Sequence, residues 1–242
     1  NIYAAVHAQI RDTEHEALAE LDLATKIDAE SKQPLLQTTD QLPDLMAHAY
    51  HTKHQHYDPV MQRIADESNG AVRFEAAKLK GLWRCVEKLA HQPPNGSDSC
   101  ASLVDVVRGT LRSPSVAGLV AALRVLYAMQ QQGVLRIMRI KNRLRHAVSS
   151  GWADCLVNFV VTADERQHIC EVQLIHEKML LVRKPMGGHE SYVHFRGAGE
   201  VAEMLLPQRD AYALVGLFVS TGGEHWHRKR NWCSDSPLKS WE

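Results

Sequence analysis

The sequence lacks several features that would point directly to a class of protein. No run of apolar residues approaches the roughly 20 that a helix needs to cross a bilayer, so we expect no membrane span. The dipeptide His-Asp does not occur, which leaves a metal phosphohydrolase of the His-Asp type unsupported. Net charge is also absent, because 28 Lys and Arg balance 28 Asp and Glu. A strongly basic protein that binds long nucleic acid is therefore not indicated.

The five cysteines show no Cys-x-x-Cys spacing, and their odd number leaves one without a partner in any disulfide framework. Both observations favour reduced thiols and an intracellular protein over a disulfide scaffold or a zinc site. They do not distinguish the cytosol from a plastid. The cysteines are Cys85, Cys100, Cys155, Cys170 and Cys233.

Histidine, in contrast, is abundant, and several of the 14 histidines gather in residues 48–56. Such a cluster can bind a metal, but on a helix it is more often a solvated face, and we favour that interpretation. An apolar content of 45% in 242 residues predicts a packed core, in one sizeable domain or in one domain with appendages. The chain starts at Asn1 without a methionine and stops at Glu242, and we expect more sequence beyond both ends.

Helical periodicity dominates residues 1–70, which we expect to form a helical N-terminal region. Residues 74–91 predict a further amphipathic helix. Three basic residues recur at every fourth position along it, which makes this stripe either a solvated face or a phosphate-binding surface. The stripe consists of Lys80, Arg84 and Lys88.

Residues 103–111 predict a strand, or the turn that leads into one. A long helix follows, with Ser113 as its N-cap, Pro114 at its first position and Gly133 just beyond its end. Residues 134–141 predict a second strand, which runs into a basic segment. That segment contains Arg139, Lys141, Arg143 and Arg145.

Two segments of alternating apolarity flank the polar residues 162–167 and predict an antiparallel hairpin. If the turn is symmetric, Asn158 lies directly across from Glu171, and an amide and a carboxylate project from one polar face. A single wet face is the default for such a hairpin. A lone glutamate among apolar neighbours is nevertheless a weak choice for a strand, which makes Glu171 a candidate for function.

Together these elements predict an α+β protein with a mixed, largely antiparallel sheet covered by helices. Asp105 and Glu171 supply carboxylates, and the basic stripe and basic segment supply cations. Phosphoryl-group chemistry needs this combination, because Mg²⁺ is held by carboxylates together with substrate phosphates, and Lys and Arg neutralise the phosphate oxygens. Trp152 could stack on a base, although a core position is the commoner use of a tryptophan.

Six segments between residues 78 and 174 also keep a particular order and spacing. They are KLKGLWR at 78–84, LVDVVR at 103–108, the helix after Ser113, RIKNR at 139–143, GW at 151–152 and CEVQL at 170–174. They resemble the synthetase-type nucleotidyltransferase domain of the RelA/SpoT alarmone family. The likeness is greatest to its divergent eukaryotic versions in algae, oomycetes and protists.

The resemblance implies a catalytic role for Glu171 and a Mg²⁺ site formed by Glu171 and Asp105. It matches Arg139 and Lys141 to a phosphate-binding Arg-x-Lys run, and Trp152 to a tyrosine that stacks on the acceptor guanine. In that family, magnesium-bound ATP donates pyrophosphate to the 3′-hydroxyl of GDP or GTP. We add to the nucleotide-binding candidates three basic residues, Lys80, Arg84 and Arg108, and the resemblance adds an aromatic-basic tail at His189, Tyr192 and Phe195.

The chain departs from the family at two places. The family's Gly-Tyr-Gln-Ser-Leu-His is Gly-Trp-Ala-Asp-Cys-Leu at 151–156, which loses the serine and the final histidine. The family's metal-binding aspartate precedes the matched arginine by five residues, whereas Asp105 precedes Arg108 by three. On a regular strand these two side chains would face opposite sides, which puts the metal site in question.

The C-terminal residues 208–241 resemble the N-terminal cap that opens leucine-rich repeat arrays, with Trp226, Trp232 and Trp241 as structural residues. A cap of this kind implies a following repeat region that binds a protein partner. We therefore expect three regions. They are a helical N-terminal region at 1–70, a nucleotidyltransferase domain at 71–200 and the start of a repeat region at 201–242.

Two hypotheses of different classes follow. The first is a nucleotidyltransferase-like module that binds purine nucleotides (ATP, GDP or GTP) with magnesium. The alternative is a catalytically silent module in a larger leucine-rich repeat scaffold. They differ in one structural consequence, because an active site needs Asp105 and Glu171 on the same face, close together and facing the basic helix.

Overall fold

The computed structural model describes residues 2–26, 34–90, 99–148 and 151–183. They form a five-stranded sheet with helices packed on it, within one compact unit of Asn1–Leu89 and Ser97–Val182. The predicted repeat cap and the tail at 189–195 lie outside the described residues. In the part of the chain that the structure describes, no helix has the length and apolar character that a bilayer span requires.

The sheet has the strand order β1-β2-β5-β4-β3. Strands β2 (Val107–Ser113) and β5 (Cys170–His176) run parallel. The other pairs are antiparallel, and they involve β1 (Arg73–Ala76), β4 (Cys155–Val161) and β3 (Leu135–Asn142). The predicted mixed, largely antiparallel sheet is confirmed.

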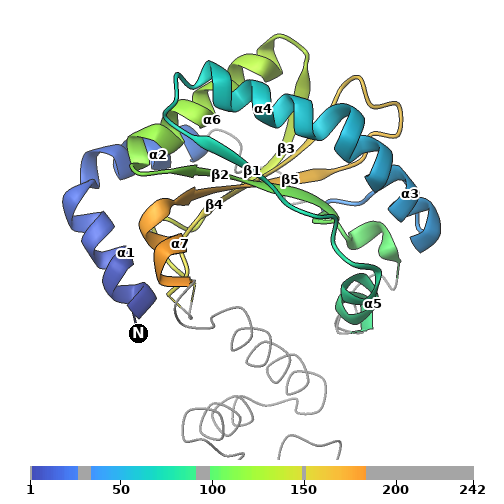
Figure 1. Ribbon diagram of the computed structural model, residues 1–242, viewed down its shortest axis with the longest axis horizontal. Helices are drawn as coiled ribbons and strands as arrows, with labels where there is room; N and C mark the ends of the chain where they lie inside the picture. The colour runs from blue at the N-terminus through green and yellow to red at the C-terminus, as the bar shows by residue number, and fades with distance from the viewer. Residues whose placement is uncertain (1, 27–33, 91–98, 149–150, 184–242) are drawn as a thin grey trace, which may run out of the picture. The chain divides into compact units, whose positions relative to one another are not determined.

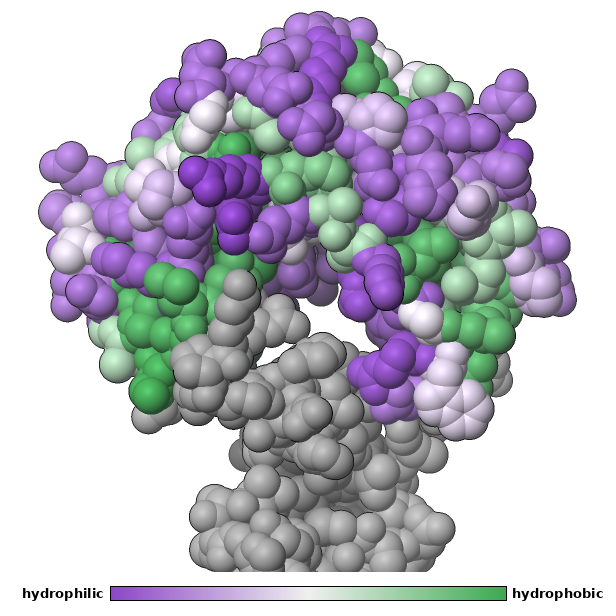
Figure 2. All heavy atoms as spheres, in the orientation of Figure 1, coloured by the Kyte–Doolittle hydropathy of each residue, from purple (hydrophilic) through white to green (hydrophobic). Residues whose placement is uncertain are grey.

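Helices α6 (Val116–Gln131), α4 (Asp58–Glu67) and α3 (Leu42–Thr52) cover one face of the sheet (Figure 1). Strand alternation directs Val157, Phe159 and Val172 to this face, and all three are fully buried. Hydrophilic residues predominate on the outer side of the helical layer, which is solvated (Figure 2).

The remaining helices lie around this layer and on the opposite side of the sheet. Helix α2 (His15–Lys26) packs on α6 and β3, and it follows α1 (Ile2–Thr13). Helices α5 (Leu82–Ala90) and α7 (Glu177–Arg183) lie on the side of the sheet away from α6 (Figure 1). The face of the sheet away from α6 is therefore less completely covered by the described helices than the face that α3, α4 and α6 cover.

A π-helical turn, Lys53–Tyr57, joins α3 to α4 and places Tyr57 in the core. The Tyr57 ring stacks on Phe159, with 5.8 Å between ring centroids. Its hydroxyl donates a hydrogen bond of 2.7 Å to the main-chain oxygen of Glu171. Single π turns within helices are frequent at functional sites, and this one ties the helical layer to the strand that carries Glu171.

The helix expected at 74–91 is wrong in its first part. Arg73–Ala76 pairs with β2 as an edge strand, and the helix begins only at Leu82. The reason is tertiary, because Phe74 packs edge-on against Tyr57 and thereby completes the core beside β2. Helical spacing of the later leucines extended the prediction too far toward the N-terminus.

The sequence led us to expect Ser113 as the N-cap of α6, but this prediction is wrong. The N-cap is Ser115, whose Oγ accepts a hydrogen bond from the amide of Gly118 at 3.2 Å. Ser113 instead ends β2, where its hydroxyl donates to the main-chain oxygen of Ala71 at 2.8 Å. Gly133 follows the helix with φ 73°, a conformation that suits glycine.

We expect Gly109→Ala to destabilise the protein, because the new Cβ would lie 2.8 Å from Phe74 Cε2 and 2.9 Å from the Tyr57 hydroxyl. Forcing a methyl group into a packed core costs roughly 1–3 kcal/mol. Urea unfolding would measure the loss. Gly81→Ala is the matched control, since a Cβ there meets no atom within 4 Å, and equal stability of the two variants would contradict the packing argument.

Candidate functional site

A row of polar residues crosses four strands on the face of the sheet that α6 does not cover. Arg108 of β2 pairs with Glu171 of β5, Glu171 with Asn158 of β4, and Asn158 with Arg139 of β3. Paired residues on neighbouring strands project to the same side. The predicted apposition of Asn158 and Glu171 is therefore confirmed, and the register extends it to two arginines.

A β-bulge places Arg139 in this row. The register shifts by one residue between Ile137, which pairs with Phe159 on the core face, and Arg139, which pairs with Asn158. In a regular strand without the bulge, Ile137 and Arg139 are two residues apart and would project to the same side. The bulge thus turns Arg139, and two residues later Lys141, to the polar face.

The Glu171 side chain is half-buried on the polar face of the sheet. Burial raises the pKa of this carboxyl, and the negative charge of Asp105 raises it further, whereas Lys88 and Arg108 oppose the shift. Within the described part of the chain, no side chain donates a hydrogen bond to it. Because no side chain of the described residues binds this carboxylate, it can accept a proton or bind a cation from a ligand.

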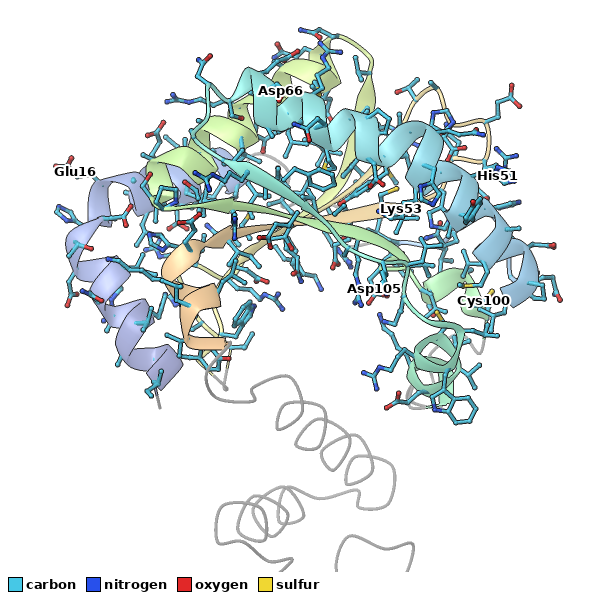
Figure 3. The ribbon with its side chains drawn as sticks, viewed as in Figure 1. Glu16, His51, Lys53, Asp66, Cys100 and Asp105 are labelled. Carbon is cyan, nitrogen blue, oxygen red and sulfur yellow. The ribbon has the colours of Figure 1, made fainter. Side chains whose placement is uncertain are left out.

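Asp105 is bound by two lysines, one on each oxygen. Lys80 Nζ lies 2.6 Å from Oδ2, and Lys88 Nζ lies 3.0 Å from Oδ1. Figure 3 shows Asp105 between the sheet and α5, the helix that carries Lys88. Burial alone would raise the pKa of Asp105, but the two ammonium groups outweigh it and lower the pKa to about 2.

The expectation that Asp105 and Arg108 face opposite sides assumed a regular strand, and that condition is not met. Asp105 lies in the turn that precedes β2, so the alternation of a regular strand does not apply to it. Its charge acts on Glu171, as does that of Arg108. The structure therefore brings both predicted carboxylates to the same side of the sheet, facing the basic helix.

The predicted basic stripe divides into two parts. Lys80 precedes α5 and is almost fully buried, yet it converges with Lys88 on Asp105. Arg84 does not join them, because its guanidinium pairs with Glu87 on the same helix. Arg84 remains a predicted nucleotide-binding residue that this structure holds apart from the row.

Trp152 is held in place from two directions. Its indole N–H donates to Asp154 Oδ2 at 3.0 Å, and the ring of Tyr3 meets it edge-on at 5.6 Å between centroids. Asp154 is fully buried and accepts two hydrogen bonds from Arg143, of 2.6 and 2.7 Å. The aspartate that replaces the expected serine is therefore the group that orients the tryptophan.

The site carries more positive than negative charge. Five cationic side chains surround two carboxylates, and within the described residues Arg108 and Lys141 form no ion pair. Such a surface suits a polyphosphate, whose oxygens need several cations. The cations are Lys80, Lys88, Arg108, Arg139 and Lys141, and the carboxylates are Asp105 and Glu171.

The histidines of residues 48–56 do not form a metal centre. Among the residues that the structure describes, no group of three or more His, Cys, Asp or Glu side chains could hold an ion. His51 and His54 instead pack against the ring of Tyr50. The solvated-face interpretation is the better one for this segment.

Sequence reasoning missed Tyr57 and Gln37. Both act on the β4–β5 hairpin from helices or loops far away in the sequence. Gln37 Nε2 donates to the main-chain oxygens of Leu103 and Ile169, and its Oε1 accepts from the Ile169 amide. No local pattern marks either residue, because what each supports is more than 60 positions away.

Two solved structures resemble this fold over most of their length. Small alarmone synthetase 1 of Bacillus subtilis aligns with a TM-score of 0.51 and 11% identity, over 77% of this chain and 96% of that chain. The structure of that protein bound to its product pppGpp gives a TM-score of 0.51, 10% identity and the same coverage. The chain has the fold of an alarmone synthetase. No protein-family model and no curated protein sequence matches it.

An alarmone synthetase fold at this identity fixes the arrangement of strands and leaves the reaction open. The predicted resemblance of residues 78–174 is thus confirmed as a fold. The divergent eukaryotic origin, the repeat cap and the boundaries at 70 and 200 stay predictions.

The Lys80–Asp105–Lys88 cluster predicts a specific acid response. The folded-state pKa of Asp105, about 2, lies below its unfolded value of 3.8. Its stabilisation is therefore complete above pH 4 and is lost as the pH falls through 2, and it amounts to about 2 kcal/mol. Urea unfolding of Asp105→Asn should show a shallower loss of stability between pH 4 and 2 than the parent protein.

The exposed carboxylate of Glu165, in the β4–β5 turn, offers a control. Glu165→Gln should leave the slope of the parent protein unchanged. Identical slopes for the parent and Asp105→Asn would mean that the two lysines do not stabilise the aspartate.

Proposed function

We propose that this chain is a nucleotidyltransferase module that binds a purine nucleoside polyphosphate on the polar face of the sheet. The observation that carries the proposal is Glu171, a half-buried carboxylate with a raised pKa and no internal partner among the described residues, set among five cations on an alarmone synthetase fold. Arg108, Arg139 and Lys141 would bind phosphate oxygens. Trp152 would stack on the base.

The donor set fits magnesium in part. Mg²⁺ takes one or two carboxylates together with substrate phosphates, and Glu171 offers a carboxylate without a competing donor in the described residues. Asp105 offers oxygens that Lys80 and Lys88 already bind. It would be a second ligand only with Lys80 and Lys88 bound to the phosphates instead. Bound Mg²⁺ would neutralise phosphate charge and align the reacting groups.

The reaction proposed is transfer of pyrophosphate from ATP to the 3′-hydroxyl of GDP or GTP. The hydroxyl oxygen forms a bond to the β-phosphorus of ATP. The bond between that phosphorus and the oxygen that bridges the α- and β-phosphates breaks, and AMP leaves with the bridging oxygen. Glu171 accepts the proton of the hydroxyl. Its raised pKa makes it a stronger base than an exposed glutamate. Arg139 and Lys141 stabilise charge on the phosphate oxygens.

A second function, a silent scaffold module, draws support from the lysine pair on Asp105. A carboxylate with both oxygens bonded to ammonium groups is satisfied without any ion. Leu156, at the position of the expected histidine, is a buried apolar residue near the start of β4. In this alternative a leucine-rich repeat region would bind the protein partner, and the sheet would serve assembly.

We expect Glu171→Gln to reduce pyrophosphate transfer by at least 100-fold, the scale of a lost general base, while nucleotide binding persists. The assay incubates the purified chain with magnesium, labelled ATP and GDP, GTP or GMP, and separates the products. Glu165→Gln should retain full activity.

Product formation that survives Glu171→Gln would remove Glu171 from the site. No product and no binding of any of these nucleotides by the parent protein would favour the scaffold.

A further inference from the structure

Asn158 occupies the position between the opposite charges of the site. It pairs with Glu171 on one neighbouring strand and with Arg139 on the other. Neighbouring strands lie about 4.8 Å apart, so the two charged residues are about 10 Å apart at the backbone. Side chains as long as these can close such a gap, and the charge of Glu171 already acts on Arg139, whose pKa it raises against the effect of burial.

The amide of Asn158 holds the guanidinium by two hydrogen bonds. Oδ1 accepts from Arg139 Nε at 3.1 Å and from Nη2 at 2.8 Å. Nδ2 lies 3.4 Å from the main-chain oxygen of Cys170 and 3.5 Å from that of Val104. Because a guanidinium only donates and a carbonyl only accepts, these partners fix which end of the amide faces Arg139.

Burial leaves the amide little freedom. Asn158 is 1% exposed, and both strands that flank it contribute to its surroundings. Asn158, which pairs with Glu171 across the strands, thus also binds the guanidinium of Arg139. The neutral amide therefore lies between the two charged residues in the register of the sheet.

We propose that Asn158 is a positioning residue that holds the Arg139 guanidinium and prevents it from closing an ion pair with the Glu171 carboxylate. The geometry stands by itself, and the purpose of the separation rests on the proposed function. Arg139 stays available to phosphate oxygens, and Glu171 stays available to a proton. An ion pair between them would remove both groups from the site.

Two substitutions should move the titration of Glu171 in opposite directions. Asn158→Leu removes the acceptor, Arg139 reaches Glu171, and the pKa of Glu171 falls by about one unit. Asn158→Asp keeps the shape, places a second carboxylate opposite Glu171 and raises that pKa by about one unit. A merely structural role for Asn158 would give no such pair of opposite shifts.

Other charges around Glu171 remain the same in every variant. These groups lie in the turn before β2, in α5, in β2, in the segment before β4 and in β3. The phenol of Tyr57 lies on the core side of β5. The groups are Asp105, Lys88, Arg108, Asp154, Lys141 and Tyr57.

The experiment is a titration of Glu171 by carbon-detected NMR on the full chain, with Glu171→Gln to assign the signal. No nucleotide is present. The parent protein, Asn158→Leu and Asn158→Asp are compared, and Asn158→Leu is repeated with Arg139→Met. We expect the downward shift of Asn158→Leu to disappear in the double variant, because it acts through Arg139.

Thr110→Val is the matched control, since it removes a polar group from the same face of β2 and should leave the titration unchanged. A folded Asn158→Leu that titrates as the parent does would overturn the proposal, as would a shift that persists with Arg139→Met. If Asn158→Leu does not fold, the isosteric Asn158→Asp decides, and a midpoint that fails to rise overturns the proposal.

Isothermal titration with ATP and with GDP then separates this inference from the proposed function. Opposite shifts of the Glu171 midpoint without nucleotide binding would uphold the positioning role and contradict the nucleotide site. Nucleotide binding that weakens at least fivefold in Asn158→Leu, at a pH where Glu171 is ionised, would uphold both.

Discussion

A carboxylate kept inside a sheet with no donor of its own among the described residues is the constraint on which this site depends. An ionised carboxylate is expensive to remove from water unless it is paired. Here the cost is reduced by cations that act on Glu171 without bonding to it, and the remainder is expressed as a raised pKa. The surrounding features each serve to hold that arrangement. Tyr57 fixes the main chain of β5 from the core side, the bulge at Met138 turns a guanidinium to the polar face, and Asn158 keeps it at a distance.

Much of the sheet could be predicted from the sequence, because its central hairpin obeys a period of two. Alternation, together with a turn symmetric about residues 162–167, placed Asn158 opposite Glu171, and the observed register agrees. The same rule failed at β3, where Ile137 and Met138 stand side by side as two apolar residues in an otherwise alternating strand. That doubling is the local signal of the bulge. Edge strand β1 gave no comparable signal, because it is four residues long and gains its place through Phe74 and the core.

The site was harder to predict than the fold, because its contacts join segments that local patterns treat separately. The stripe of basic residues could be recognised in the sequence. The sequence did not show that Lys80 and Lys88 bind the same aspartate, or that Arg84 pairs with Glu87. The spacing of Asp105 misled for a similar reason. Parity applies within a strand, and this residue lies in the turn before one.

A catalyst and a scaffold differ in whether the charged side chains of the site are paired within the protein. Lys80, Asp105 and Lys88 satisfy one another, so this cluster is compatible with either. Glu171 is not satisfied in the described residues, and an apolar replacement at such a position is often neutral or stabilising. A scaffold has no physical use for the charge, whereas a ligand that brings a hydroxyl proton or a cation would balance it. Binding alone would also balance it. In the proposed mechanism Glu171 would also take up the proton of the hydroxyl, and a raised pKa without an ion pair would favour that step. Under that mechanism the separation of Arg139 from Glu171, and not the cationic surface, would distinguish a transferase from a nucleotide-binding scaffold.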